Sequence, residues 1–243
     1  MDDANVYFIS AGPSPEADDA GISRLPKSGG VPTRIVKGRK RASGIAQGGG
    51  SLFWADVDGI FRLDKATGAV ARVSAAGELR SPCGIAADKT HVYWAETANG
   101  DDRPTEILRA THNGQNVGTV AVNDAGFACN LALDDASVYW IDLRKGAVMR
   151  SAKNGASTTP LSAMPVVGHA LTVDASSVFV LSERAPDSIL RGSIWKLPVA
   201  GGAPVLLAID ELGLNGLATD EREIFWTGAR ASDHHGAVRR LAR

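Results

Sequence analysis

The chain has 243 residues, of which 44% are hydrophobic and 22% are charged, a composition that excludes intrinsic disorder and predicts a sizeable core. Lys and Arg number 26 and Asp and Glu 27, so no net field favours a nucleic acid or an anionic membrane as a partner. Because no apolar run reaches the roughly 20 residues of a membrane span and the start lacks the basic, apolar and small-residue order of a signal peptide, we expect a soluble chain without membrane insertion.

The predicted elements follow an internal repeat. An apolar-aromatic triplet recurs six times along the chain, at residues 6–8, 52–54, 92–94, 138–140, 178–180 and 224–226. The third residues of successive triplets lie 46, 40, 46, 40 and 46 positions apart. Since β-branched and aromatic side chains favour strands, each triplet predicts one strand of a repeated unit.

Each unit predicts three further strands around its triplet. An apolar run that ends in Asp precedes the triplet, as in residues 84–88 and 130–134, and is typical of a buried inner strand. After the triplet comes a third strand with an apolar residue two positions before a base, such as Ile107 and Arg109. A Gly-containing turn then leads to an outer strand.

Four antiparallel strands repeated every 40 to 46 residues predict an all-β chain, a six-bladed β-propeller over residues 1–243. The opening MDDANVYF aligns with LDDASVYW at residues 133–140, so the first blade is predicted to lack its inner strand. After Trp226 there is room for a third strand but not for an outer one, so the last blade is predicted to be incomplete too. An open blade edge could mediate self-association.

The pattern resembles the six-bladed YWTD-type propellers of lipoprotein-receptor ectodomains and their bacterial secreted relatives. The resemblance rests on the runs at residues 53–56, 93–96, 139–142 and 225–228, each after an inner strand, although none of them matches all four letters. Blades 1 and 5 depart from it, with Ser10 and Ser182 where the acid would stand. The resemblance implies the fold and an extracellular or periplasmic location. An NHL-type propeller is the near alternative.

One column of the repeat gives the candidate site. The residue before the start of each inner strand is polar or able to bind a metal, and the five members are Ser43, Cys83, Cys129, His169 and Asn215. In a propeller they would stand at one level near the mouth of the central channel, where a ligand binds. Cys83, Cys129 and His169 could hold a divalent metal. A Cys83–Cys129 disulfide between adjacent blades and plain packing are the alternatives, and packing is favoured.

Charged loops form a second candidate surface, because loops on a rigid scaffold are natural recognition surfaces. Three long connections carry Glu16, Asp101, Asp102, Arg103, Glu183, Arg184 and Asp187, and the connection in the last unit carries Asp233, His234 and His235. Solvated surface is the simpler interpretation of all of them. The recurring third-strand bases are interpreted as structural, as cross-strand partners of Asp56, Glu96 and Asp142.

The sequence lacks the common enzyme motifs, which favours a non-enzymatic recognition module that binds a protein or glycan. Propeller active sites take one residue from each blade, so a lyase-like or lactonase-like enzyme with a channel-mouth metal and His169 as base is the alternative. An assembly scaffold that uses an open blade edge is the third hypothesis. The identity of the ligand and any cofactor beyond such a metal stay open.

Overall fold

The computed structural model describes residues 4–10, 20–39, 42–75, 80–98, 104–123, 128, 130–163, 168–182, 192–210, 216–220, 222–229 and 236–243. These residues form strands, turns and bends and no helix. Accordingly, no helix among them is long and apolar enough to span a membrane. The chain divides into two compact units, Met1–Thr119 and Val120–Arg243, and each is described by itself.

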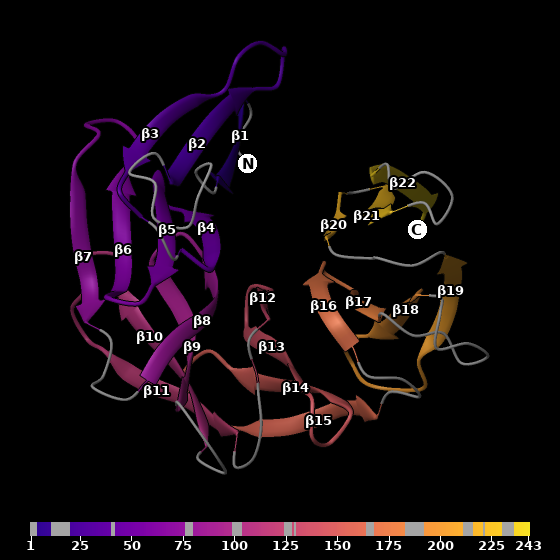
Figure 1. Ribbon diagram of the computed structural model, residues 1–243. Coiled ribbons are helices and arrows are strands. Elements are labelled where there is room, and N and C mark those ends of the chain that lie inside the picture. Colours follow the sequence, from indigo (N-terminus) through magenta and orange to yellow (C-terminus); the bar gives the residue numbers. More distant parts are fainter. Residues whose placement is uncertain are drawn as a thin grey trace. The chain divides into compact units, whose positions relative to one another are not determined.

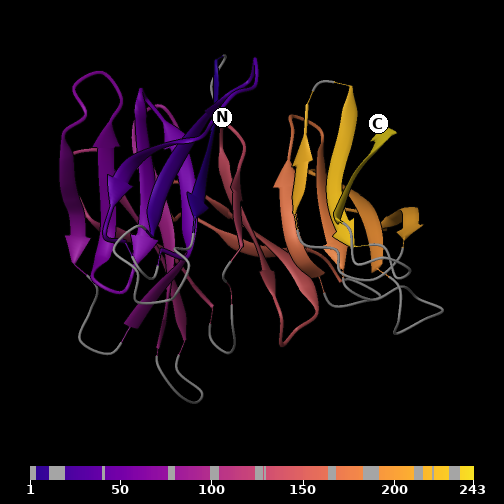
Figure 2. The same cartoon turned by 45° about the horizontal axis from the view of Figure 1, so that its top comes forward.

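The first unit holds blades 1, 2 and 3 (Figures 1 and 2). Blade 1 consists of β1 (Asn5–Ser10), β2 (Gly21–Pro26) and β3 (Thr33–Lys37). Blade 2 consists of β4 (Gly44–Gly48), β5 (Ser51–Asp56), β6 (Gly59–Asp64) and β7 (Val70–Ala75). Blade 3 consists of β8 (Arg80–Ala87), β9 (His91–Ala98), β10 (Thr105–Thr111) and β11 (Gly118–Asn123). The boundary between the units falls inside β11.

The second unit holds blades 4, 5 and 6. Blade 4 consists of β12 (Leu131–Leu133), β13 (Ser137–Asp142), β14 (Ala147–Ala152) and β15 (Thr158–Ala163). Blade 5 consists of β16 (Gly168–Val173), β17 (Ser177–Ser182), β18 (Gly192–Pro198) and β19 (Val205–Asp210). Blade 6 consists of β20 (Leu217–Thr219), β21 (Glu223–Ala229) and β22 (Gly236–Ala242).

The predicted blade pattern is confirmed. In blades 2 to 6 every triplet lies inside the second strand, and in blade 1, whose first described strand is at the second repeat position, it lies inside β1. Strands that follow one another within a blade are neighbours in its sheet. Blades 1 and 6 have three strands each among the described residues, with the second and third repeat positions of blade 1 in β1 and β2 and the inner position of blade 6 in β20. The chain therefore has the fold class that its repeat predicts, a six-bladed β-propeller.

Alternation along the second strands places the core between neighbouring blades. In β5, Phe53 packs into a cluster with Val92 and Trp94 of blade 3, whereas the next residue, Trp54, packs into a cluster with Ile22 of blade 1. Both faces of blade 2 are thus covered within the first unit. Fully burying one such side chain contributes about 1.5–3 kcal/mol, so the triplets account for much of the stability of the blades.

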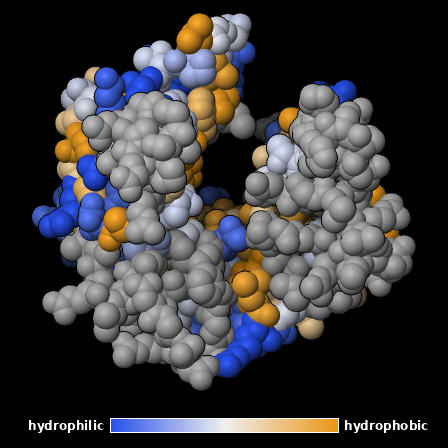
Figure 3. All heavy atoms as spheres, in the orientation of Figure 1, coloured by the Kyte–Doolittle hydropathy of each residue, from blue (hydrophilic) through white to orange (hydrophobic). Residues whose placement is uncertain are grey.

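The outer surface mixes polar and apolar side chains. Val31 is 86% exposed and Val238 is 73% exposed, and the described part of the first unit carries both hydrophobic and hydrophilic colours (Figure 3). Scattered exposed valines of this kind are ordinary for folded proteins.

The predicted glycine turns between third and outer strands are confirmed. The five turn glycines all have positive φ, between 75° and 91°, at Gly29, Gly68, Gly114, Gly155 and Gly201. Glycine populates that region without the steric cost that a Cβ atom brings. The turns therefore need glycine for backbone reasons and give no information on function.

Connections between second and third strands differ in length, and blades 1 and 5 have the long ones that were predicted whereas blade 3 does not. They are short in blade 2, from Asp56 to Gly59, and in blade 4, from Asp142 to Ala147. They are long in blade 1, from Ser10 to Gly21, and in blade 5, from Ser182 to Gly192. Blade 3 has one of intermediate length, from Ala98 to Thr105.

Candidate functional site

Strand register shows which end of a blade carries the predicted site. Gly44 at the start of β4 pairs with Ala55 near the end of β5, and Gly168 at the start of β16 pairs with Ser182 at the end of β17. The inner strands therefore begin at the end of each blade from which the connections to the third strands leave. We call this the connection end of a blade, and the opposite end the turn end.

Ser43 is the member of the predicted column whose side chain the structure describes. Its backbone N–H donates to the Ala55 carbonyl at 2.9 Å, and its hydroxyl donates to the Pro82 carbonyl at 3.4 Å. Pro82 directly precedes Cys83, so the structure brings Ser43 of blade 2 next to the same column in blade 3. The hydroxyl joins two blades, which agrees with a structural role.

The other members of the column are described in part. The backbone of Cys83 lies in β8 and that of His169 lies in β16, each at an irregularity of the strand register, but their side chains fall outside the described set. Cys129 and Asn215 fall outside the described residues altogether. No group of three or more His, Cys, Asp or Glu side chains that could hold a metal ion occurs among the described residues. The ligand, metal and disulfide hypotheses stay predictions.

The predicted loop surface also lies outside the described residues, since Glu16, Asp101, Asp102, Arg103, Glu183, Arg184, Asp187, Asp233, His234 and His235 all belong to segments that the structure does not describe. What the structure does describe is the pair of strands from which each of these connections starts and to which it returns.

Asp56, at the connection end of blade 2, is held by two kinds of contact. One oxygen accepts the Asp58 N–H at 2.8 Å, which closes the short connection, and the other lies 3.4 Å from a guanidinium nitrogen of Arg39. The Arg39 guanidinium in turn lies 4.0 Å from the centroid of the Phe61 ring. Asp56 is only 4% exposed, so its charge is committed to the fold.

The equivalent acids of blades 3 and 4 are also buried and bound by groups of their own blades. Glu96 accepts the indole N–H of Trp94 at 3.0 Å, and it is 6% exposed. Asp142 is fully buried, accepts the N–H groups of Arg144 at 3.0 Å and Lys145 at 2.9 Å, and lies 3.4 Å from the Lys145 ammonium. Buried carboxylates that are hydrogen-bonded in this way act as structural groups.

The prediction that the third-strand bases pair with these acids is wrong. Register places the bases opposite the aromatic residue of the second strand, as for Arg62 opposite Phe53 and Arg150 opposite Tyr139. The Arg150 guanidinium donates to the Val199 carbonyl of blade 5 at 2.7 Å. The bases therefore lie too far along the strand to reach the acids, whose described cationic partners come from connections instead.

At the turn end, an Asp closes the turn between inner and second strands and binds a tyrosine of its own blade. The Asp134 carboxylate accepts the Tyr139 hydroxyl at 2.6 Å, and the Asp88 carboxylate accepts the Tyr93 hydroxyl at 3.3 Å. Burial, together with the neighbouring Asp charge and hydrogen bond, raises the pKa of each tyrosine to about 12. Both hydroxyls thus stay protonated donors at neutral pH.

A second device at the turn end joins neighbouring blades. The residue directly after the third strand places its side chain on the aromatic residue of the preceding blade. The Lys65 ammonium lies 5.5 Å from the Tyr7 ring centroid, the His112 ring lies 4.7 Å from that of Phe53, and the Arg243 guanidinium lies 5.8 Å from that of Phe179. The repeat alignment contains this column, but no role for it was predicted from the sequence.

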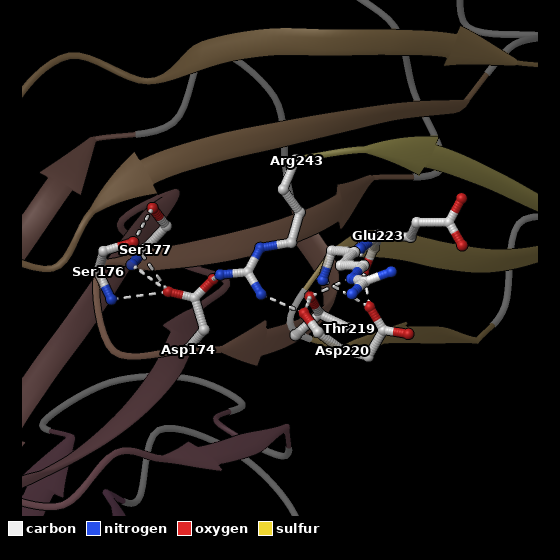
Figure 4. A network of polar contacts seen from close by, with 8 residues as sticks. Asp174, Ser176, Ser177, Thr219, Asp220, Glu223 and Arg243 are labelled. Atoms are coloured by element: carbon white, nitrogen blue, oxygen red, sulfur yellow. Dashed lines mark hydrogen bonds and ion pairs between the residues drawn. The ribbon is translucent and has the colours of Figure 1, made fainter.

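Arg243, a member of this column, also binds polar groups of blades 5 and 6 (Figure 4). Its guanidinium forms an ion pair with the Asp174 carboxylate and donates to the Asp220 carbonyl. Asp174 also accepts the N–H groups of Ser176 at 2.7 Å and Ser177 at 2.8 Å. Blade 5 has Phe179 where blades 3 and 4 have tyrosine, so the Asp174 oxygen that a tyrosine would bind takes an arginine of blade 6 instead.

Blades 1 and 2 enclose a pocket of about 240 Å³ at the turn end. Its lining residues come from β1, β2, β3, β6 and the turn after β6, and they are Tyr7, Arg24, Ile35, Leu63, Asp64, Lys65 and Gly68. Arg24 is one of the recurring third-strand bases that the sequence pattern indicates to be structural, and that pattern does not predict the pocket.

By its blades, this chain belongs to the fold class of six-bladed β-propellers. No family model matches the sequence, and no curated protein matches it. Among solved structures, the chain is similar to TolB from Acinetobacter baumannii, with a TM-score of 0.72, 14% identity and coverage of 98% of this chain and 61% of that chain. A chain from a nidogen/laminin complex matches with a TM-score of 0.62, 18% identity and coverage of 79% and 72%.

An oligogalacturonate lyase in complex with manganese matches as well, with a TM-score of 0.65, 14% identity and coverage of 89% of this chain and 66% of that chain. This chain thus spans less than two thirds of the TolB and lyase chains. At such identities the likenesses show the fold alone, and the same fold carries binding proteins and enzymes.

Proposed function

We propose that this chain is a non-enzymatic recognition module of the YWTD type, which binds a protein or a glycan through the connection end of its blades. The main observation behind the proposal is that the acids at that end are bound within the fold and are not available to a ligand. Asp56, Glu96 and Asp142 are buried and hydrogen-bonded within their own blades, so they give the strands rigid ends. Connections of variable length and charge then start from fixed positions, as recognition loops do.

The YWTD-type assignment is supported by the way in which these acids are used. In blades 2 and 4 the Asp that follows the apolar-aromatic triplet closes the short connection by accepting N–H groups. In blade 1 the hydroxyl of Ser10 stands in this position and hydrogen-bonds that of Ser23 at 2.9 Å. The likeness to a chain of the nidogen/laminin complex agrees with a binding role.

Binding to a glycan array and to a displayed peptide library tests the proposal. A variant with Asp101→Ala, Asp102→Ala and Arg103→Ala should weaken the binding of a retained ligand by about tenfold or more, because a few central residues carry most binding energy. Asp135→Ala removes an exposed charge at the turn end and should leave the affinity unchanged. Equal affinities of the two variants would contradict the use of the connection end.

Metal analysis separates this proposal from the lyase-like or lactonase-like alternative. The recognition module needs no bound metal, so the purified chain and the His169→Ala variant should have the same metal content and the same thermal stability. A stoichiometric metal that the His169→Ala variant loses would overturn the proposal and favour the enzyme with a channel-mouth metal.

A further inference from the structure

The pocket between blades 1 and 2 lies beside one of the contacts that join neighbouring blades. Between blades 2 and 3, the His112 ring packs on Phe53, and the Asp88 carbonyl lies so close to Gly48 that a Cβ atom there would come within 2.1 Å of it. Between blades 5 and 6, Arg243 binds Asp174. Between blades 1 and 2, Lys65 lies over Tyr7, but a volume of about 240 Å³ stays open beside them.

Arg24 differs from its repeat equivalent in blade 4. Arg150 donates to the carbonyl of Val199, the residue after the third strand of blade 5. The corresponding residue for Arg24 would be Lys65, yet within the described part of the chain the Arg24 guanidinium makes no hydrogen bond or ion pair. Arg24 is exposed and lines the pocket. Blade 1 therefore presents to the pocket a cation, Arg24, whose equivalent in blade 4, Arg150, is hydrogen-bonded.

Among the described residues that line the pocket, Asp64 is the only carboxylate, and its charge is compensated by its surroundings. Asp64 accepts the N–H groups of Thr67 and Ala66, each at 3.0 Å, and lies 2.9 Å from the Arg62 guanidinium. The Thr67 N–H, more than the other groups, lowers the pKa of Asp64 below its ordinary value, so the carboxylate is ionised and compensated. With Arg24 and Lys65 the pocket has a net positive charge, which favours an anion.

Size and lining restrict the kind of anion. The pocket has a volume of about 240 Å³, whereas pockets for drug-sized ligands have about 300–1,000 Å³. The pocket therefore suits one side chain or one small molecule. Ile35, Leu63 and the Tyr7 ring supply apolar walls. A planar carboxylate matches the fork of an arginine guanidinium and leaves an organic body for those walls.

We propose that the pocket lined by Tyr7, Arg24, Ile35, Leu63 and Lys65 binds a carboxylate carried on a small organic body, with Arg24 as the anchoring cation. The body is either a free small acid or an acidic side chain of a partner protein. Because the pocket is at the turn end of blades 1 and 2, the proposal does not depend on the recognition function of the connection end.

Calorimetric titration of the full chain tests the proposal with paired probes. N-acetyl-glutamate and glucuronate represent free acids, and a capped tripeptide with a central Glu represents a protein side chain. N-acetyl-glutamine, glucose and the matching Gln peptide are the uncharged controls. At least one acid should bind more tightly than its neutral partner, and its affinity should fall as salt is added.

Variants assign the binding to the pocket. Arg24→Gln should weaken the acid that binds by about tenfold or more, since a charge-assisted hydrogen bond is lost, and Lys65→Gln should weaken it as well. Lys27→Gln is the matched control, because Lys27 directly follows the third strand of blade 1, is exposed and does not line the pocket. Equal binding of acids and neutral partners, no binding of any acid at millimolar concentration, or an equal effect of Lys27→Gln and Arg24→Gln would overturn the proposal.

Discussion

Arg243 and Asp174 form an ion pair that joins blade 6 to blade 5, and their side chains are only 21% and 12% exposed. Burial on its own would raise the pKa of Asp174, but the N–H groups of Ser176 and Ser177 and the Arg243 charge outweigh it and lower the pKa below the ordinary value of 3.8. Asp174 is therefore ionised at neutral pH, and its charge depends on a residue that is 69 positions away in the sequence.

Replacing Arg243 by Gln should destabilise the chain. Loss of the partner leaves a mostly buried carboxylate with fewer hydrogen bonds, so we expect the free energy of unfolding to fall by about 1.5–3 kcal/mol, as measured by urea denaturation. Arg240→Gln is the control, because the Arg240 side chain is 70% exposed in its ion pair with Glu223 and should change stability by less than about 1 kcal/mol. Similar losses in both variants would refute the special role of Arg243.

Gly48→Ala should be costly although the position has no positive φ. The added methyl group would lie 2.1 Å from the Asp88 carbonyl oxygen of the next blade and 3.0 Å from the Ala87 methyl group. The neighbour is backbone and cannot rotate away, so a loss of about 1–3 kcal/mol is expected in thermal or urea unfolding. Gly118→Ala, which would meet no atom within 4 Å, should leave stability nearly unchanged, and an equal loss there would contradict the steric account.

His112 should make stability depend on pH near neutrality. Burial lowers the pKa of His112 below 6.5, and its Nε2 atom is buried with no hydrogen-bond partner among the described residues. Its contribution to stability is therefore fully present above 6.5 and is lost as the pH falls from there toward the lower folded-state pKa.

The His112→Phe variant keeps a ring against Phe53 and removes the titrating group. Urea midpoints measured at several pH values between about 8 and 5.5 should therefore decline less steeply with acidification for this variant than for the native chain. A native slope in the His112→Phe variant would show that other groups cause the pH dependence.

Tyr139→Phe should reduce sensitivity to alkali. The raised pKa of about 12 means that Tyr139 contributes stability that is fully present below the ordinary value of 10 and is lost as the pH rises through 12. The variant lacks this loss, but at neutral pH it gives up the hydrogen bond to Asp134 and about 1–2 kcal/mol. Spectrophotometric titration of the tyrosines should show one fewer high-pH transition, and an unchanged titration curve would contradict the assignment.

The blades could be predicted from the sequence because each strand is indicated by residues that are close together in the chain. The triplet Val138-Tyr139-Trp140 identifies a strand through its β-branched and aromatic residues, and its repetition at other positions fixes the number of blades without any knowledge of long-range contacts. The incomplete blades at both ends followed from the same alignment, and among the described residues blades 1 and 6 have three strands each.

Side-chain partners were harder to predict, because they depend on register between strands and on contacts between blades. The pairing of third-strand bases with Asp56, Glu96 and Asp142 was wrong, since a base lies opposite the aromatic residue, as Arg150 does opposite Tyr139. The acids lie further along the strand. The pocket also escaped prediction, because a gap between blades depends on the volumes that surround Tyr7 and Lys65 and not on either residue alone.

Gly48 also shows how far the blades are interchangeable. At the same repeat position blades 3, 4, 5 and 6 have Asp88, Asp134, Asp174 and Asp220, and only blade 2 has glycine, because the carbonyl of the following blade fills the space of the missing side chain. The backbones of blades 2 and 3 therefore approach each other at this point more closely than a side chain on residue 48 would allow. A glycine in place of the aspartate at this repeat position adapts blade 2 to the blade that follows it, so the repeats are not fully interchangeable.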